Sequence, residues 1–110
     1  MTAKTPVTVL PVPGPRSAPG SAEQFARDFD RLLRADAPRV ILDMRDVEYL
    51  DSTFLGKLVA GLARIKQSGG GLRLCNLQAP VSTLFEFLRL DRVVDICETE
   101  DEARFALGGE

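Results

Sequence analysis

Apolar residues recur along this chain in two alternating patterns, which predict strands and helices in turn. Short runs that are apolar at consecutive or alternate positions predict strands, and runs with apolar residues every three or four positions predict helices. The predicted strands are "PVTVLPVPG" (6–14), "RVILDM" (39–44), "LRLCNL" (72–77) and "RVVDIC" (92–97). The predicted helices cover residues 22–36, 52–67, 79–90 and 99–107.

This regular alternation of strands and helices is typical of an α/β fold. We expect one domain over residues 1–110, with loose ends at 1–5 and 108–110. Its sheet is predicted to be mixed, mainly parallel, with about four to five strands flanked by about four helices. The prolines in the first run cannot donate backbone hydrogen bonds, so we expect that strand to lie at an edge of the sheet or to have a ragged end.

Polar residues mark the predicted helix ends. Ser21, followed by Gln24 three positions later, resembles a capping box for the first helix. The glycines of "SGGG" (68–71) end the second helix, because glycine adopts the left-handed conformation that a helix end often needs. Thr99, with acidic residues directly after it, is the expected cap of the last helix.

The segment "VEYLDSTFLGKLV" (47–59) places an aspartate and two hydroxyl residues at the mouth of the second helix. One interpretation is that Asp51 or Ser52 caps the helix and that the neighbouring hydroxyl is incidental. The other is that an exposed serine there is phosphorylated, which adds charge and three acceptor oxygens. The helix N-terminus would tolerate a phosphate within the domain, so such a switch would act on a partner that docks there.

Composition removes several functional classes. The net charge of -2 and the absence of a basic run argue against nucleic-acid binding. The chain has no histidine and only two cysteines, Cys75 and Cys97, which we expect to be reduced thiols in apolar strands. No signal peptide or membrane span is expected, and we predict a soluble cytoplasmic protein without a metal or cofactor.

Enzymatic chemistry also finds little support. Without histidine, a serine nucleophile lacks its commonest base. The acidic side chains around the second helix are expected to be solvated; these are Asp43, Asp46, Glu48 and Asp51. The glycines at 69–71 lie between a helix and a strand, whereas a phosphate-binding loop lies between a strand and the following helix. We therefore predict that the chain is not an enzyme.

Residues 39–77, "RVILDMRDVEYLDSTFLGKLVAGLARIKQSGGGLRLCNL", resemble the STAS domain of bacterial anti-sigma factor antagonists. The matching features are a strand ending in Leu-Asp, the segment "VEYLDST" with Leu-Gly after it, the glycine turn and the next strand. A weaker similarity extends over about residues 21–107. The resemblance implies a mixed sheet flanked by helices.

The resemblance also implies a function. In that family the unphosphorylated antagonist binds an anti-sigma factor, which is also a serine kinase of the histidine-kinase-like ATPase type. The kinase phosphorylates the hydroxyl residue after the aspartate, the antagonist dissociates, and a metal-dependent phosphatase resets it. Carried onto this chain, the phospho-acceptor is Ser52, with Thr53 as the secondary candidate. The implied partner-binding residues are Asp46, Glu48, Asp51, Phe54, Leu55 and Gly56.

Two features depart from the family pattern. Phe54 stands where the family usually has glycine. We expect its ring to pack inward with the apolar stripe of the helix, and the alternative is an exposed aromatic that a partner binds. In addition, this chain offers one strand before its Pro/Gly-rich loop, where the family usually has two.

Three functional hypotheses follow. The first is a protein-interaction switch governed by phosphorylation of Ser52. The second is a constitutive STAS adaptor subunit of a lipid-transport or signalling complex, in which the hydroxyl groups only cap the helix. The third, which the composition disfavours, is a small enzyme or nucleotide-binding protein that uses the acidic loop.

Overall fold

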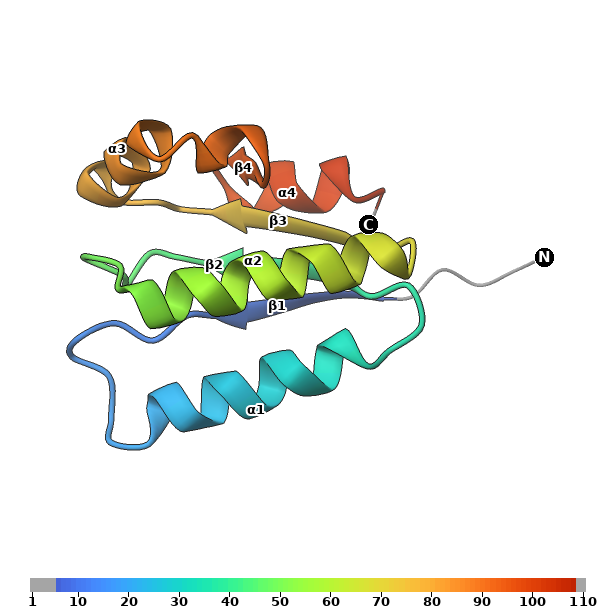
Figure 1. Ribbon diagram of the computed structural model, residues 1–110, viewed down its shortest axis with the longest axis horizontal. Helices are drawn as coiled ribbons and strands as arrows, with labels where there is room; N and C mark the ends of the chain where they lie inside the picture. Colours follow the sequence, from blue (N-terminus) through green and yellow to red (C-terminus); the bar gives the residue numbers. More distant parts are fainter. Residues whose placement is uncertain (1–5, 109–110) are drawn as a thin grey trace.

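A computed structural model describes residues 6–108 and has the predicted alternation of strands and helices (Figure 1). The strands are β1 (Val7–Pro11), β2 (Arg39–Asp43), β3 (Gly71–Cys75) and β4 (Asp95–Cys97). The helices are α1 (Ser21–Leu33), α2 (Ser52–Gln67), α3 (Ala79–Phe87), the short 3₁₀ helix η1 (Leu90–Arg92) and α4 (Glu100–Ala106). The predicted loose ends at 1–5 and, except for Gly108, at 108–110 lie outside the described residues.

The strands form one sheet in the order β1-β2-β3-β4, so neighbours in the chain are also neighbours in the sheet. Every pairing among the described strands is parallel. This arrangement confirms the predicted α/β class, with four strands and four α-helices, although the described strands form a parallel sheet and not the predicted mixed one. As predicted, the proline-containing β1 lies at an edge, and it is the one strand before α1 in the described part of the chain.

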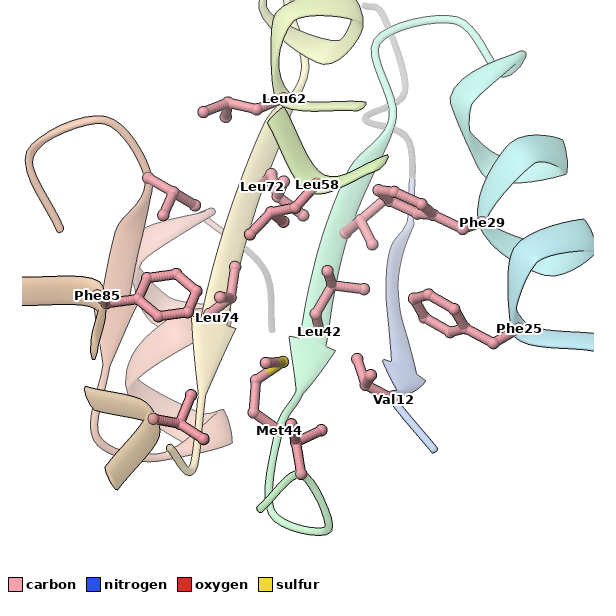
Figure 2. Close-up of a cluster of buried hydrophobic side chains, with 14 of the residues drawn as sticks. Val12, Phe25, Phe29, Leu42, Met44, Leu58, Leu62, Leu72, Leu74 and Phe85 are labelled. Carbon is pink, nitrogen blue, oxygen red and sulfur yellow. The ribbon is translucent and has the colours of Figure 1, made fainter. Parts of the chain in front are cut away.

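Alternate residues of the strands face two different layers of helix. Val40 and Leu42 of β2 face the main core, which α1, α2 and α3 cover from one side. In Figure 2, Phe25 and Phe29 point from α1 toward the sheet, and Phe85 closes the core at the far end. Burial of these large apolar side chains, each worth about 1.5–3 kcal/mol, holds the three helices on this face.

The opposite face of the sheet is covered by α4. Ile41, Cys75 and Ala103 are fully buried there, and Cys97 packs against them. Both cysteines are free thiols, as the sequence predicts. Burial, and next the negative charge of Asp43, raise the pKa of the Cys75 thiol to about 11.

The crossing of α1 and α2 depends on a glycine. A Cβ atom at Gly61 of α2 would lie 2.7 Å from Cζ of Phe29. The ring of Phe29 therefore occupies the space that any larger residue at position 61 would need. This close contact sets the separation of the two helices, whose N-terminal halves border the candidate site described below.

Two details of the predicted helices and strands are wrong. Ser21 is not the cap of α1, because Gly20 precedes the helix in a left-handed conformation (φ 86°) without a side-chain cap. Gln24 bonds instead to Asp28 along the helix surface. The fourth strand is also shorter than predicted, because Arg89 adopts a positive φ of 60° and the chain then turns through η1 before reaching β4.

Candidate functional site

Parallel strands place the loops that follow them along one edge of the sheet, on the left of Figure 1. The loop after β2, residues 44–51, leads along this edge into α2. Its base is held by the buried carboxylate of Asp43, which accepts hydrogen bonds from the backbone N–H of Arg45 and from Nδ2 of Asn76, each at 3.1 Å. Carboxyl ends of parallel strands are the usual position of functional sites in α/β folds.

Asp51 is the N-cap of α2. Its backbone is extended (φ -111°, ψ 169°), and its carboxylate accepts a 2.8 Å hydrogen bond from the N–H of Phe54. This bond satisfies one of the free N–H groups at the start of the helix, a contribution of about 1 kcal/mol. Of the two caps considered from the sequence, the structure has Asp51.

Ser52 and Thr53 are the first residues of the helix, and both are exposed. Among residues 6–108 neither hydroxyl group forms a hydrogen bond. The first turn of α2 holds no acidic side chain. Because Asp51 already caps the helix, the Ser52 hydroxyl is free for another use.

The acidic residues of the loop do not form one cluster. Glu48 makes an ion pair with Arg16 from the loop after β1. Asp46 is exposed, and it lines a shallow depression together with Glu48 and Arg16. The loop therefore carries partly neutralised charge. Of the three predicted binding residues, Glu48 pairs with Arg16 and Asp51 caps α2, while the side chain of Asp46 forms no hydrogen bond or ion pair within residues 6–108.

Phe54 faces inward, as expected from its place in the apolar stripe. Its ring is half-buried, packs against the core and lies 6.2 Å from the ring of Phe25, centroid to centroid. Leu55 is half-buried, while Gly56 is exposed with no atom within 4 Å of where a Cβ would stand. The predicted site residues of α2 thus divide between an outer surface and an inner wall.

That inner wall belongs to a pocket of about 280 Å³ between the N-terminal halves of α1 and α2. Phe25 and Val12, seen at the lower right of Figure 2, form part of its floor. Its other lining residues come from both edge loops and both helices: Pro13, Gly14, Pro15, Ala22, Ala26, Val47, Tyr49, Leu50, Asp51, Thr53, Phe54 and Lys57. The pocket therefore opens directly beside the predicted phosphorylation site.

The two edge loops that border the pocket are closely packed. A Cβ atom at Gly14 would lie 1.8 Å from the carbonyl oxygen of Asp46. Glycine is therefore required at position 14 for this approach. The ion pair between Arg16 and Glu48 joins the same two loops farther out. These contacts hold the loop after β1 in place as one wall of the pocket.

Sequence reasoning missed this pocket, because its lining residues are separated along the chain and meet only through the parallel topology. It also missed Lys57, which the apolar pattern of α2 does not single out. One local signal was available. Thr53 and Lys57 are four positions apart, so both lie on the same face of α2.

No group of three or more histidine, cysteine or acidic side chains that could hold a metal ion occurs among the described residues. Asp43 and Asp51 are each engaged in hydrogen bonds to the protein itself. Among residues 6–108, no helix combines the length and apolar character that a membrane crossing requires.

Comparison with known proteins identifies a family. The sequence profile of the STAS domain matches residues 1–103 of this chain. A solved structure of an anti-sigma-factor antagonist (STAS) domain protein from Planctomyces limnophilus superposes with a TM-score of 0.78 and is 29% identical, covering 94% of this chain and 92% of that one.

Two relatives have names that describe a role. A Thermotoga maritima protein, provisionally named an anti-sigma factor antagonist, is 36% identical over 75 residues, which span 68% of this chain and 66% of that protein. The anti-sigma-B factor antagonist of Bacillus subtilis is 40% identical over 53 residues, 48% of this chain and 49% of that protein. The matches thus span about half to two thirds of the length of these relatives.

Proposed function

The chain belongs to the STAS domain family, and we propose that it acts as an anti-sigma factor antagonist. In its unphosphorylated form it binds a partner anti-sigma factor that is also a serine kinase. Phosphorylation of Ser52 by that kinase releases the complex. The names of the relatives support the general role, and the geometry at the start of α2 supports the choice of residue.

The single observation behind this choice is that Asp51, and not Ser52, caps the helix. Asp51 caps the helix through its bond to the N–H of Phe54. Ser52 is exposed, and its hydroxyl forms no hydrogen bond with the described part of the chain. A kinase can therefore reach the Ser52 oxygen without first breaking a bond that holds the fold.

A phosphate at Ser52 is compatible with the folded domain. It would stand at the N-terminus of a 16-residue helix, where the helix dipole favours negative charge. The first turn of α2 has no acidic side chain, and the neighbouring Asp51 carboxylate is engaged by the N–H of Phe54. We therefore expect phosphorylation to leave the domain folded and to act on the interface.

At the interface, the phosphate adds about -1.5 to -2 charges that a bound partner would have to desolvate or accommodate. A penalty of about 3 kcal/mol weakens binding roughly a hundredfold. In the proposed cycle, a metal-dependent serine phosphatase removes the phosphate and restores binding. The chain itself carries out no reaction in this cycle, and we propose that it works in the cytoplasm.

The alternative is a constitutive STAS adaptor subunit of another assembly. Exposed apolar side chains away from Ser52 favour it. Val59 of α2 is 49% exposed and Phe87 of α3 is 81% exposed. A partner that stays bound could cover these side chains regardless of phosphorylation.

A binding experiment with Ser52 variants separates the two functions. Affinity-tagged wild-type, Ser52→Ala and Ser52→Glu chains are expressed in the native cells, and bound proteins are identified by mass spectrometry. The switch predicts that Ser52→Ala retains an anti-sigma factor and Ser52→Glu loses it, with Thr53→Glu as the neighbouring control. Equal recovery of the same partner by all variants would favour the constitutive adaptor.

A further inference from the structure

We propose that the pocket between α1 and α2 is the anchor point of the partner interface and receives one large apolar side chain of the partner protein. We further propose that a carboxylate next to that side chain pairs with Lys57. Both statements presuppose the partner binding proposed above. They add a position, a chemistry and a set of residues that the phosphorylation site by itself does not supply.

The first support is position. Asp51 and Thr53, the residues on either side of Ser52, both line the pocket, while Ser52 does not. A partner that covers Ser52 must also lie over the mouth of the pocket. Well-packed interfaces leave few voids, and their strongest contacts are large side chains seated in pockets near the centre. If the pocket stayed empty in the complex, the interface would have a void near its centre and would lack such a contact.

The second support is size. The pocket volume of about 280 Å³ lies below the roughly 300–1,000 Å³ of typical small-molecule sites. Its wall is mainly apolar, with Val12, Phe25 and Phe54 among the lining residues. A pocket of this size and lining fits a single leucine, methionine or aromatic side chain better than a cofactor or a metabolite.

The third support is charge. Lys57 is the only cation among the lining residues, and it forms no ion pair within residues 6–108. Asp51, the one lining carboxylate, already accepts the N–H of Phe54. The free ammonium group at the wall favours a carboxylate close to the inserted side chain.

This arrangement also explains release. Lys57 lies five positions after Ser52 in α2, which is a rise of about 7.5 Å along the axis and a rotation of about 140° around it. The two positions therefore face different sides of the helix, and Lys57 lines the pocket while Ser52 does not. A phosphate on Ser52 would add negative charge to the surface beside the pocket, which disfavours a partner that brings a carboxylate there. Phosphorylation thus weakens the anchor without entering the pocket.

The first test uses a small probe of the same chemistry on the whole chain. N-acetyl-phenylalanine has an aromatic side chain beside a carboxylate, and N-acetyl-phenylalanine amide is its neutral counterpart. We expect saturable NMR shifts of amides lining the pocket, with a Kd on the order of 1 mM for the acid. We expect the amide to bind about threefold more weakly, and Lys57→Gln to remove that difference.

Filling the pocket provides the control. Ala26→Leu and Ala22→Leu place a larger side chain on the α1 wall and should each weaken probe binding at least tenfold. Ala63→Leu adds the same side chain at an exposed position of α2 that does not line the pocket, and should have no effect. Ala22 is exposed, so Ala22→Leu tests the pocket even if Ala26→Leu fails to fold. Absence of binding, or binding unchanged by both fillings, would overturn the proposal.

The second test uses the anti-sigma factor recovered with Ser52→Ala. Ala22→Leu in that background should weaken its binding at least tenfold, and Ala63→Leu should not. If the Ser52→Ala chain binds no anti-sigma factor, the proposed function itself fails. If it binds and the filled variants bind equally well, only the pocket anchor fails. A small molecule found in the pocket by native mass spectrometry would also overturn the anchor.

Discussion

The starts of α2 and α4 use the same kinds of residue in opposite ways. At α2, the carboxylate of Asp51 is the cap and the hydroxyl of Ser52 is left without a partner. At α4, the hydroxyl of Thr99 is the cap, accepting a 3.1 Å hydrogen bond from the N–H of Glu102. The first turn of α4 holds three acidic residues, whereas that of α2 holds none.

This difference gives the two hydroxyl groups different roles: that of Thr99 stabilises the fold, whereas that of Ser52 is available for regulation. At α4 the hydroxyl is occupied, and the acidic side chains already satisfy the helix dipole, so a phosphate on Thr99 would remove the cap and meet like charge. At α2 the hydroxyl is free, the first turn holds no acidic residue, and the carboxylate of Asp51 at the N-cap supplies the negative charge there. A hydroxyl next to an aspartate is thus a candidate switch only where the aspartate has taken the capping role.

The largest effect that would sharpen this comparison is phosphorylation itself. Phosphoserine incorporated at position 52 should weaken binding of the anti-sigma factor roughly a hundredfold, or about 3 kcal/mol, because the partner must accommodate the added charge. Calorimetric titration measures the affinity, and thermal unfolding checks that the domain stays folded. If the phosphorylated chain bound the partner as tightly as the unmodified one, Ser52 at the start of α2 would not be a regulatory site.

Alkaline pH is expected to lower the free energy of unfolding by a similar amount, through the buried Cys75 thiol on the face of the sheet that α4 covers. Burial raises the pKa of Cys75 from 9.0 to about 11, so the folded thiol keeps its proton at pH values where the unfolded thiol ionises. Stability is therefore fully present below pH 9 and falls between pH 9 and 11, by about 2–3 kcal/mol for this group.

Urea unfolding at several pH values measures that loss. Cys75→Ala serves as the reference, because it shares every other group that titrates in the same range. The free energy of unfolding of the wild type should fall more steeply between pH 9 and 11 than that of Cys75→Ala. Parallel pH profiles would show that the Cys75 thiol is not protected from ionisation in the folded chain.

Removal of the α4 cap has a smaller effect. Thr99→Ala deletes the acceptor of the Glu102 N–H and should lower the free energy of unfolding by about 1 kcal/mol. Affinity for the anti-sigma factor should not change, since Thr99 is far in sequence from α2 and does not line the pocket. A loss of binding with unchanged stability would assign Thr99 to the interface instead.

The smallest expected effect is that of Ser52→Ala on stability. Because the hydroxyl makes no hydrogen bond in the described chain, the free energy of unfolding should change by less than about 0.5 kcal/mol. Asp51→Ala, the matched loss of the actual cap, should cost about 1 kcal/mol. Equal losses for the two variants would mean that both side chains share the capping role.

Local patterns predicted much of the fold. The spacing of apolar residues located all four helices and strands, and the inward packing of Phe54 followed from its place in the stripe. The predicted ends of helices and strands were wrong where the backbone conformation, and not a side chain, sets the end. Gly20 starts α1 through a left-handed φ of 86° although Ser21 offers a hydroxyl, and Arg89 turns the chain at φ 60° within a run that otherwise favours a strand.

The candidate site was predicted only in part for a related reason. Asp51, Ser52 and Thr53 are adjacent in the sequence, so their position at a helix mouth could be inferred from local pattern. The pocket beside them depends on Phe25 of α1 meeting Phe54 of α2, and on the loop after β1 lying against the loop after β2. Such contacts are set by the parallel strand order, which no short stretch of sequence specifies.

Phosphosite mapping by mass spectrometry tests the central claim most directly. Protein isolated from its native cells in growth and under stress would be digested and searched for phosphate on residues 52 and 53, with the Ser52→Ala chain as control. The account predicts phosphate on Ser52 whose occupancy changes between conditions. A Ser52 that is unmodified in every condition, while the anti-sigma factor still binds and dissociates, would contradict it.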